Sequence, residues 1–288
     1  MKEYFKNDKH IFEATINNSI FGDTIKIGGK SFNDCINISI NNDFPTKAKI
    51  PHLQSEPECS FDNILDNKDT VDFIKASLQY VSKKYPDIKT FEFDDMSNIE
   101  CGIKKMNVLP KTRKTDKPFS LAHLYLATYG ETWYENRFGA KIINKDARNK
   151  YEESIKKLHE KIDIEYNKFK WLYKINNIQD KILSNYYSKD KTWIEFFTSI
   201  PKNEKCNALY NWLPSCINEI LDNRFIQNGW YIDINTMLKT TMEIVEKPNN
   251  MKGGKRTMKG GKQTRKSRIK ITNKQYYHGN GHIFDGND

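Results

Sequence analysis

The chain has 288 residues, 37% of them hydrophobic, and a mean hydropathy of −0.79. This length favours about two domains, with apolar material for one medium core and a smaller one. Its apolar runs, such as PFSLAHLYLATYG, are shorter than the roughly 18 to 20 residues that a membrane-spanning helix needs, and MKEYFKNDKH contains no apolar signal region. The composition therefore excludes fibrous and transmembrane classes and predicts a soluble intracellular protein without a membrane partner.

The net charge of +10 is concentrated near the C-terminus. Residues 251–270 hold nine Lys or Arg and no acid, and residues 271–288 carry a net charge of −1. Residues 1–250 are therefore left with +2, which is close to neutral. A segment rich in Gly and Lys, with few apolar side chains, cannot offset the entropy lost on ordering, so we expect residues 248–288 to form a disordered basic tail.

The first elements in chain order predict a sheet with a crossover helix. Residues 20–55 alternate as strands do, with a Gly-Gly turn signal between them. Apolar residues recur at spacings of three and four between residues 71 and 81, which indicates a helix capped by Asp69 or Thr70. The segment IKTFEFDD, residues 88–95, then favours a strand, so a strand, a helix and a strand follow one another.

The stretch TYGETWYENRFGAKI, residues 128–142, predicts two short helices and a strand. A helix starting near Ser120 is capped by Gly130, a second contains Trp133 and Tyr134, and Gly139 opens a strand AKII. Two interpretations remain open at this point. The stretch is either a packed structural corner, or Tyr134 and the backbone around it line a site.

The chain beyond residue 143 predicts long helices. Apolar residues between 151 and 169 recur at intervals of three and four, which indicates one apolar stripe on a charged helix. Two aromatic segments would pack against it, and Pro214 bends or restarts the second. GWYIDI predicts a short strand, followed by a last helix at 236–247. The predicted parts are an α/β domain at 1–144, a helical domain at 145–247 and the tail at 248–288.

The five cysteines predict no covalent framework. They lie at positions 35, 59, 101, 206 and 216, an odd number widely scattered and without a Cys-x-x-Cys pair. Neither a disulfide framework nor a zinc knuckle is indicated, so we expect the cysteines to be reduced and mostly buried, and we expect no metal site.

Two resemblances rest on these segments. The order of TVDFIKASLQYVSKKYP, KTFEFDDMS, FSLAHLYLATYG and WYENRFGAKI resembles the second half of GNAT-type N-acyltransferases, over roughly residues 20–143. The whole chain, with FDDMSNIEC, TWYENRFGA, TWIEFF and the GGK-type tail, resembles uncharacterised proteins of large DNA viruses, the giant viruses. Together they imply an α/β (α+β) fold with a GNAT-like mixed sheet and flanking helices, and a location in the host cell cytoplasm or the virion.

The acyltransferase resemblance implies a cofactor site that this sequence does not match. In that family the acyl-CoA pyrophosphate is bound by backbone N–H groups of a glycine-rich loop, at the start of the helix that corresponds to residues 70–85. The segment SEPECSFDNILDNKD before this helix has five carboxylates, one lysine and no glycine. We therefore expect no cofactor, and acetyl-CoA or another acyl-CoA only if the chain is an active acyltransferase.

Three residues are candidates for catalysis. Tyr134 matches the position at which the family has a tyrosine that can protonate the leaving thiolate. Asp94 and Asp95 end a predicted strand, where a carboxylate can act as general base on an amine. The structural alternatives are a packed aromatic side chain for Tyr134 and turn-capping acids for the two aspartates.

The tail predicts contact with a polyanion. Lysines and arginines spaced by glycines can follow a phosphate backbone without reading sequence. These residues are Lys252, Lys255, Arg256, Lys259, Lys262, Arg265, Lys266, Arg268 and Lys270. The partner is nucleic acid or another polyanion, and the alternative is a tail that only solubilises. The leading hypothesis is thus a non-catalytic binding or virion-associated protein, and the second is a divergent acyl-CoA-dependent N-acyltransferase.

Overall fold

The structure is a computed structural model that describes residues 1–29, 34–54, 57–61, 65, 69–95, 97–99, 119–222, 225, 228–237, 240–248 and 269–271. The strands of its main sheet are β1 (Lys2–Lys6), β2 (Ile11–Ser19), β3 (Gly22–Gly28), β4 (Asp34–Asn41), β5 (Lys47–Leu53), β6 (Thr90–Asp94), β9 (Lys141–Ile142), β10 (Gly229–Asp233) and β11 (Glu243–Val245). Within the described residues they follow the order β11-β1-β2-β3-β4-β5-β6-β10-β9. The mixed α/β architecture predicted from the sequence is therefore confirmed.

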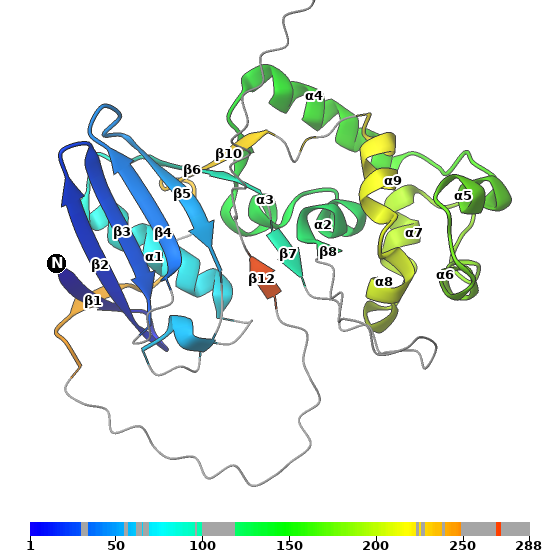
Figure 1. The fold of residues 1–288 in the computed structure, drawn as a ribbon. Helices are drawn as coiled ribbons and strands as arrows, with labels where there is room; N and C mark the ends of the chain where they lie inside the picture. Colours follow the sequence, from blue (N-terminus) through cyan, green and yellow to red (C-terminus); the bar gives the residue numbers. More distant parts are fainter. Residues whose placement is uncertain are drawn as a thin grey trace, which may run out of the picture.

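One helix connects the parallel pair of this sheet. Strands β5 and β6 run parallel, and the helix α1 (Thr70–Lys84) crosses between them, whereas the other neighbouring strands are antiparallel. The predicted helix and crossover are thus confirmed. Figure 1 shows α1 lying across one face of the first five strands.

Alternation along the strands explains which face α1 covers. Strands β2 to β5 bury alternate apolar residues, among them Phe12, Ile25 and Ile38, and place polar residues between them. Two ring contacts join this apolar face to α1: Phe5 stacks on Tyr80 at 4.6 Å, and Phe12 lies 4.8 Å from Phe73. The opposite face of these strands is polar.

The two short helices and the strand predicted for residues 128–142 are present in the structure. They are α2 (Leu121–Tyr129), α3 (Trp133–Phe138) and the strand β9. Gly130 and Gly139 end the two helices in the left-handed conformation, with φ of 73° and 62°, which a residue without a Cβ adopts at least cost.

The remaining helices gather at the other side of the molecule, on the right of Figure 1. They are α4 (Lys145–Ile155), α5 (Tyr166–Leu172), α6 (Asn177–Leu183), α7 (Trp193–Ser199), α8 (Lys202–Leu209) and α9 (Leu213–Ile220), with short 3-10 turns η1 (Pro57–Cys59) and η2 (Lys156–His159). Pro214 lies in the first turn of α9, so the predicted restart is confirmed.

The prediction of one continuous helix across residues 151–169 is wrong. The chain leaves α4 through η2, and Ile162 then donates its N–H to Lys191 O at 3.0 Å before α5 begins. This long-range pairing replaces the helical hydrogen bonds there. Tyr151 and Phe169 are nevertheless buried, so the apolar spacing marked core positions correctly.

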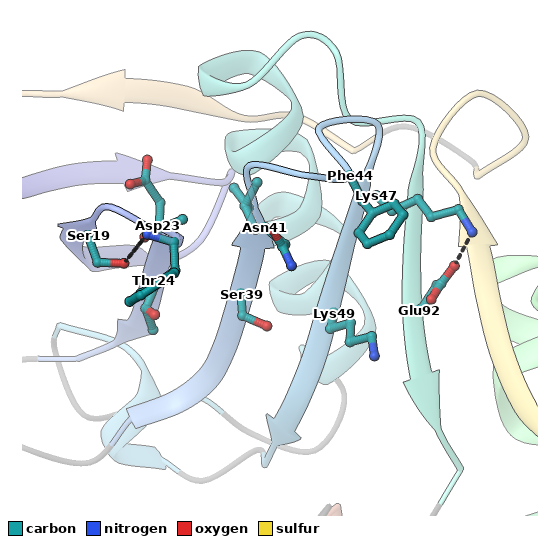
Figure 2. A pocket seen from close by; sticks show the side chains of 12 residues that line it. Ser19, Asp23, Thr24, Ser39, Asn41, Phe44, Lys47, Lys49 and Glu92 are labelled. Atoms are coloured by element: carbon teal, nitrogen blue, oxygen red, sulfur yellow. Dashed lines mark hydrogen bonds and ion pairs between the residues drawn. The ribbon is translucent and has the colours of Figure 1, made fainter.

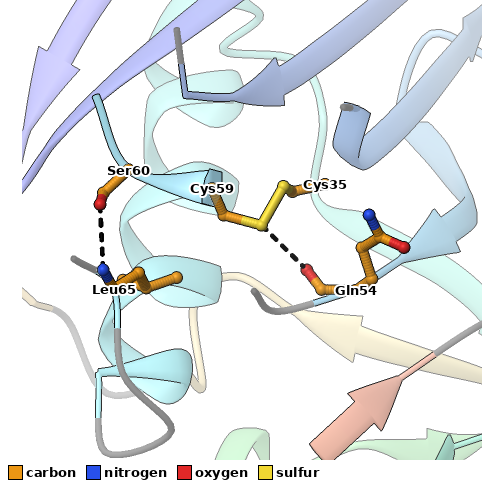
Figure 3. The surroundings of a disulfide bond; sticks show 5 residues. All are labelled: Cys35, Gln54, Cys59, Ser60 and Leu65. Carbon is orange, nitrogen blue, oxygen red and sulfur yellow. Dashed lines mark hydrogen bonds between the residues drawn. A yellow bond between two sulfur atoms is a disulfide. The ribbon is translucent and has the colours of Figure 1, made fainter. Parts of the chain in front are cut away.

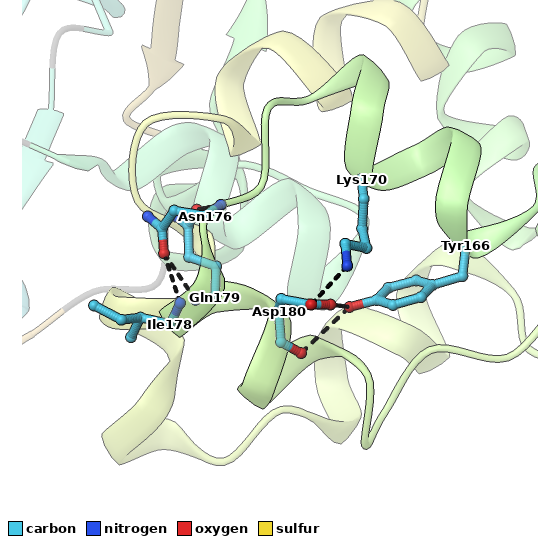
Figure 4. A network of polar contacts seen from close by, with 6 residues as sticks. All are labelled: Tyr166, Lys170, Asn176, Ile178, Gln179 and Asp180. Carbon is cyan, nitrogen blue, oxygen red and sulfur yellow. Dashed lines mark hydrogen bonds and ion pairs between the residues drawn. The ribbon is translucent and has the colours of Figure 1, made fainter.

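A polar network braces the next helical pair. Asp180 on α6 accepts hydrogen bonds from the Tyr166 hydroxyl at 2.7 Å and from Lys170 Nζ at 2.6 Å, both on α5 (Figure 4). A capping box of Asn176 and Gln179 starts α6. These contacts hold the two short helices together over an aromatic cluster built on Phe169, Tyr173, Tyr187, Trp193, Phe196 and Trp212.

The last predicted helix, 236–247, is also wrong. Its residues 243–245 form β11, which pairs antiparallel with β1 through Val245 opposite Tyr4. The free edge of β1 offers N–H and C=O partners that outweigh a weak local preference for helix. The segment 145–247, predicted as a helical domain, therefore supplies two strands of the main sheet, β10 and β11.

A disulfide corrects the prediction that the cysteines are reduced. Cys35 at the start of β4 is bonded to Cys59 in η1, with 5.7 Å between their Cα atoms (Figure 3). Cys206 is also disulfide-bonded, and Cys216 is free and buried. The fold brings residues 24 positions apart into contact, and the sequence spacing carries no sign of this.

Part of the predicted disordered tail is a strand. Residues Ile269–Ile271 form β12, which pairs with β7 (Ser97–Ile99), and β7 pairs with β8 (Phe119–Ser120). Of the nine basic tail residues, only Lys270 lies within the described residues. In the part of the chain that the structure describes, no helix has the length and apolar character needed to cross a membrane.

Candidate functional site

The sheet opens between its two parallel strands. Cα partners run from Lys47 and Thr90 to Lys49 and Glu92, where the ladder of the described residues ends. Strand β5 continues to Leu53, and β6 continues to Asp94 while pairing with β10 on its other side. We call the space between these carboxyl ends the β5–β6 split. In open α/β sheets, crevices at the carboxyl ends of parallel strands are the usual ligand sites.

Apolar side chains fill the β5–β6 split. The remaining space is about 220 Å³ and is too narrow to admit a water molecule. Its walls are Ile50, Leu53, Ile74, Phe93, Tyr134 and Ile232. The Tyr134 ring lies 4.4 Å from that of Phe93 and 4.9 Å from that of Trp133. The tyrosine predicted as a general acid therefore forms a wall of a closed, apolar space.

The helix α3 fixes the position of Tyr134. Thr132 accepts a hydrogen bond from the N–H of Glu135, and the Glu135 carboxylate accepts one from the N–H of Thr132, so both ends of a capping box are made. The Tyr151 hydroxyl also donates to Glu135. This half-buried carboxylate and its partner were not predicted, although the spacing T-x-x-E in TWYE is a sequence signal for the capping box.

The two candidate aspartates lie in different environments. Asp94 is exposed, whereas Asp95 is 2% exposed, as expected for neighbours on an alternating strand end. Oδ1 of Asp95 accepts hydrogen bonds from the Ser97 hydroxyl at 2.6 Å and the Ser97 N–H at 3.1 Å, and its Oδ2 has no partner among the described residues. Burial raises the pKa of Asp95 to about 6, against the lowering effect of the Ser97 hydrogen bonds.

Asp95 shares its buried region with two phenols. Burial raises the pKa of Tyr134 well above its ordinary value, and the charge of Asp95 raises it further. Burial also raises the pKa of Tyr151, and the negative charges of Glu135 and Asp95 raise it further. The Nε1 of Trp230, whose ring meets that of Tyr151 edge-on at 5.7 Å, is buried without a partner in the described part of the chain. The structure thus brings Tyr134 and Asp95 together, and leaves Asp94 outside.

The start of α1 carries an acid in place of an anion site. Asp69 occupies the N-cap position, but its side chain makes no cap hydrogen bond. It is bound instead by Lys9 Nζ at 2.6 Å and His10 Nε2 at 3.2 Å. Burial raises the pKa of Asp69, but hydrogen bonds from Lys9 and His10 outweigh this effect, so its pKa is lower than usual. This carboxylate and its two basic partners therefore occupy the helix start, where a pyrophosphate would have to bind.

The described residues do not fit an acyl-CoA at the two places that the acyltransferase resemblance implies. The split that would hold the acyl end is filled, and the helix start that would hold the pyrophosphate carries Asp69. No group of three or more His, Cys, Asp or Glu side chains in the described residues is placed to hold a metal ion. No family model matches the chain, and neither does a curated protein or a solved structure.

Proposed function

We propose that the protein is a non-catalytic binding protein, viral and virion-associated or cytoplasmic, with a degenerate acyltransferase-like core and a tail that contacts polyanions. The order of strand, crossover helix, strand, tyrosine-bearing helix and strand in residues 47–142 supports the GNAT-like description. The resemblance to proteins of large DNA viruses supports the viral assignment.

The closed β5–β6 split carries the non-catalytic part of this proposal. A general acid must reach the atom it protonates, within hydrogen-bond distance or through one water. Tyr134 is 2% exposed and lines an apolar space without room for water, which supports a packed side chain over an accessible acid. Asp69 supports the same conclusion, because it occupies the start of α1, where the pyrophosphate of an acyl-CoA would bind.

A thermal-shift comparison tests this part. The full chain is melted with acetyl-CoA and, separately, with 3′-phospho-ADP, which is the nucleotide portion of the same molecule. A ligand that binds the folded state raises the melting temperature. We expect the two ligands to act alike, because the β5–β6 split has no room for the acyl arm. A larger shift with acetyl-CoA would overturn the proposal.

The polyanion contact is tested by neutralising charge, since a deletion of residues 251–288 would also remove β12. In the test variant, Gln replaces the eight basic residues from Lys252 to Arg268, and Lys270 is left in place. Each neutralised phosphate releases counterions, so the variant should lose most retention on heparin and most salt dependence of binding. Retention that is unchanged in the variant would refute a role for the tail.

One observation favours the second function, a divergent N-acyltransferase. Asp95 is buried, has an unpartnered carboxylate oxygen and has a pKa of about 6, which is near the value that suits a general base at neutral pH. It lies in the same buried region as Tyr134. The Tyr134→Phe substitution given in the Discussion separates this function from the first.

A further inference from the structure

A hollow lies on the polar face of the sheet, opposite α1. Its volume is about 520 Å³, within the range of small-molecule sites. Figure 2 shows this hollow with α1 behind the strands and the labelled side chains of β3, β4 and β5 in front. We call it the sheet-face groove. It spans the turn from β2 to β3, the turn from β4 to β5 and the strands between them.

Two phenylalanines on these turns line the sheet-face groove. Phe21 is 79% exposed and Phe44 is 62% exposed, and Ile20 beside Phe21 is 84% exposed. Apolar side chains are normally buried, so several exposed at one place mark a surface that meets a partner.

The two turns are tied to each other. The N–H of Asn42 donates to Phe21 O at 3.3 Å, and its side-chain amide donates to Ile20 O at 3.2 Å. At Gly22, φ is +141°, and an added Cβ would lie 1.9 Å from Ile40 O, so only glycine permits this approach. The phenylalanines are therefore presented by connected turns, which lowers the entropy lost on binding.

The floor of the groove is polar and has one cation without an ion-pair partner. Thr24, Ser39 and Lys49 are successive cross-strand partners on β3, β4 and β5, so they form a row on this face. Lys47 pairs with Glu92 at 2.8 Å. Within the described residues, Lys49 has no ion-pair partner.

The remaining acid of the lining is engaged elsewhere. Asp23 accepts hydrogen bonds from the Tyr85 hydroxyl at 2.6 Å and the Asn18 amide at 2.7 Å. The two partners of Asp23 are neutral, so they do not offset its charge, whereas Glu92 forms an ion pair with Lys47. Lys49 is therefore the basic group of the described lining that is left to meet a phosphate.

We propose that the sheet-face groove binds a nucleotide unit, with the base against Phe44 or Phe21 and the phosphate at Lys49. Aromatic rings stack on any base, a lysine attracts the phosphate, and hydroxyl groups such as those of Thr24 and Ser39 suit the sugar and base edges. This combination of flat apolar surface, hydroxyl groups and one cation matches a nucleotide better than a purely acidic peptide. The inference goes beyond the proposed function, because it uses neither the tail nor the β5–β6 split.

The test measures binding of the full chain to fluorescent oligothymidylate and to an abasic strand of the same length and charge. The abasic strand reports the tail and other phosphate contacts, and the difference between the strands reports the bases. We expect Phe44→Ala to weaken oligothymidylate binding roughly fivefold or more, the usual loss for one stacked base, and to leave abasic binding unchanged. Lys49→Gln should weaken both.

Two controls keep this test decisive. Trp171 on α5 is 78% exposed and outside the groove, so Trp171→Ala should change neither affinity. Since Phe44 is exposed on a turn, its substitution should leave the melting curve intact. Competition by free thymidine monophosphate at similar potency identifies a mononucleotide site, and competition by the strand alone identifies single-stranded nucleic acid. Equal binding of the two strands, or a folded Phe44→Ala protein with undiminished preference for bases, overturns the proposal.

Discussion

Strand β5 joins two regions, one with exposed aromatic side chains and one with buried aromatic side chains. At its start, Phe44 and the neighbouring Phe21 are exposed over the sheet-face groove. At its end, Tyr134 and Phe93 are packed against each other and close the β5–β6 split. The carboxyl end, where a parallel pair usually binds ligands, is thus shut. The opposite end, which belongs to antiparallel hairpins, is open.

The difference shows that strand topology alone does not locate a binding site. The closed end is covered by α1, α3 and β10, whose side chains supply its walls through Ile74, Tyr134 and Ile232. The open end faces away from α1 (Figure 2), and among the described residues its two phenylalanine rings are exposed. We assign the closed end to packing and the open end to binding, and substitutions of aromatic residues at both ends test this assignment.

The largest expected effect comes from the corner that closes the split. Trp133→Ala or Phe138→Ala removes a buried ring and should lower the free energy of unfolding by roughly 3 to 5 kcal/mol. Phe44→Ala, the matched change at the open end, should alter it by less than about 0.5 kcal/mol. Urea denaturation measures both, and a similar loss at the two ends would remove the distinction between them.

The second largest effect is expected from removing the Cys35–Cys59 disulfide, which lies beside the closed end. Replacing Cys35 and Cys59 together by Ala opens a covalent link between residues 24 apart, which should cost about 3 kcal/mol. Adding reductant to the wild-type protein should lower its melting temperature. The effect of reductant should shrink in the double variant, where only the disulfide of Cys206 is left to reduce. A reductant effect of the same size in both proteins would show that Cys35–Cys59 does not stabilise the fold.

Asp95 predicts an unusual dependence on pH. Its pKa is raised from 3.8 to about 6 on folding, so the folded state binds the proton more tightly. Its contribution to stability is therefore complete below about pH 4 and is lost as the pH rises through about 6, with a total on the order of 2 to 3 kcal/mol. The side chain of Asn does not titrate, so the free energy of unfolding of Asp95→Asn should not fall in this way. The variant should therefore become more stable relative to the wild type as the pH rises over the same range. Denaturation at several pH values checks this, and a constant difference between the two proteins would contradict it.

The smallest effect is expected from Tyr134→Phe. This change removes the hydroxyl and keeps the ring, so the melting curve should barely move. On the non-catalytic account no acyl transfer is lost, because none occurs. If the wild-type protein transfers an acyl group to an amine and the stable Tyr134→Phe protein does not, the N-acyltransferase function is favoured instead.

Local sequence signals predicted much of the fold. The apolar spacing of α1, Ser120 at the start of α2, and Gly130 and Gly139 at the ends of α2 and α3 act through neighbours in the chain, so they could be recognised without the structure. Trp133 and Phe138 lie in the stretch for which a packed structural corner was one of the two interpretations, and both are buried.

The errors have a common physical cause, which is contact between distant parts of the chain. The Cys35–Cys59 bond, the pairing of β11 with β1 and the contact of Ile162 with Lys191 each join segments that are not neighbours in sequence. The different burial of Asp94 and Asp95 follows from strand alternation, but which of them turns inward depends on the register with β10. The groove was not predicted either, because its two phenylalanines meet only through the hairpin turns.

Hydrogen–deuterium exchange of the full chain tests the central claim most directly, because one experiment reports both ends of β5. Oligothymidylate should slow exchange in residues 17–24 and 41–49, which contain the groove, and acetyl-CoA should leave residues 69–75 and 132–139 at the closed end unchanged. Slower exchange at the closed end with acetyl-CoA, together with no change at the groove with oligothymidylate, would contradict the account.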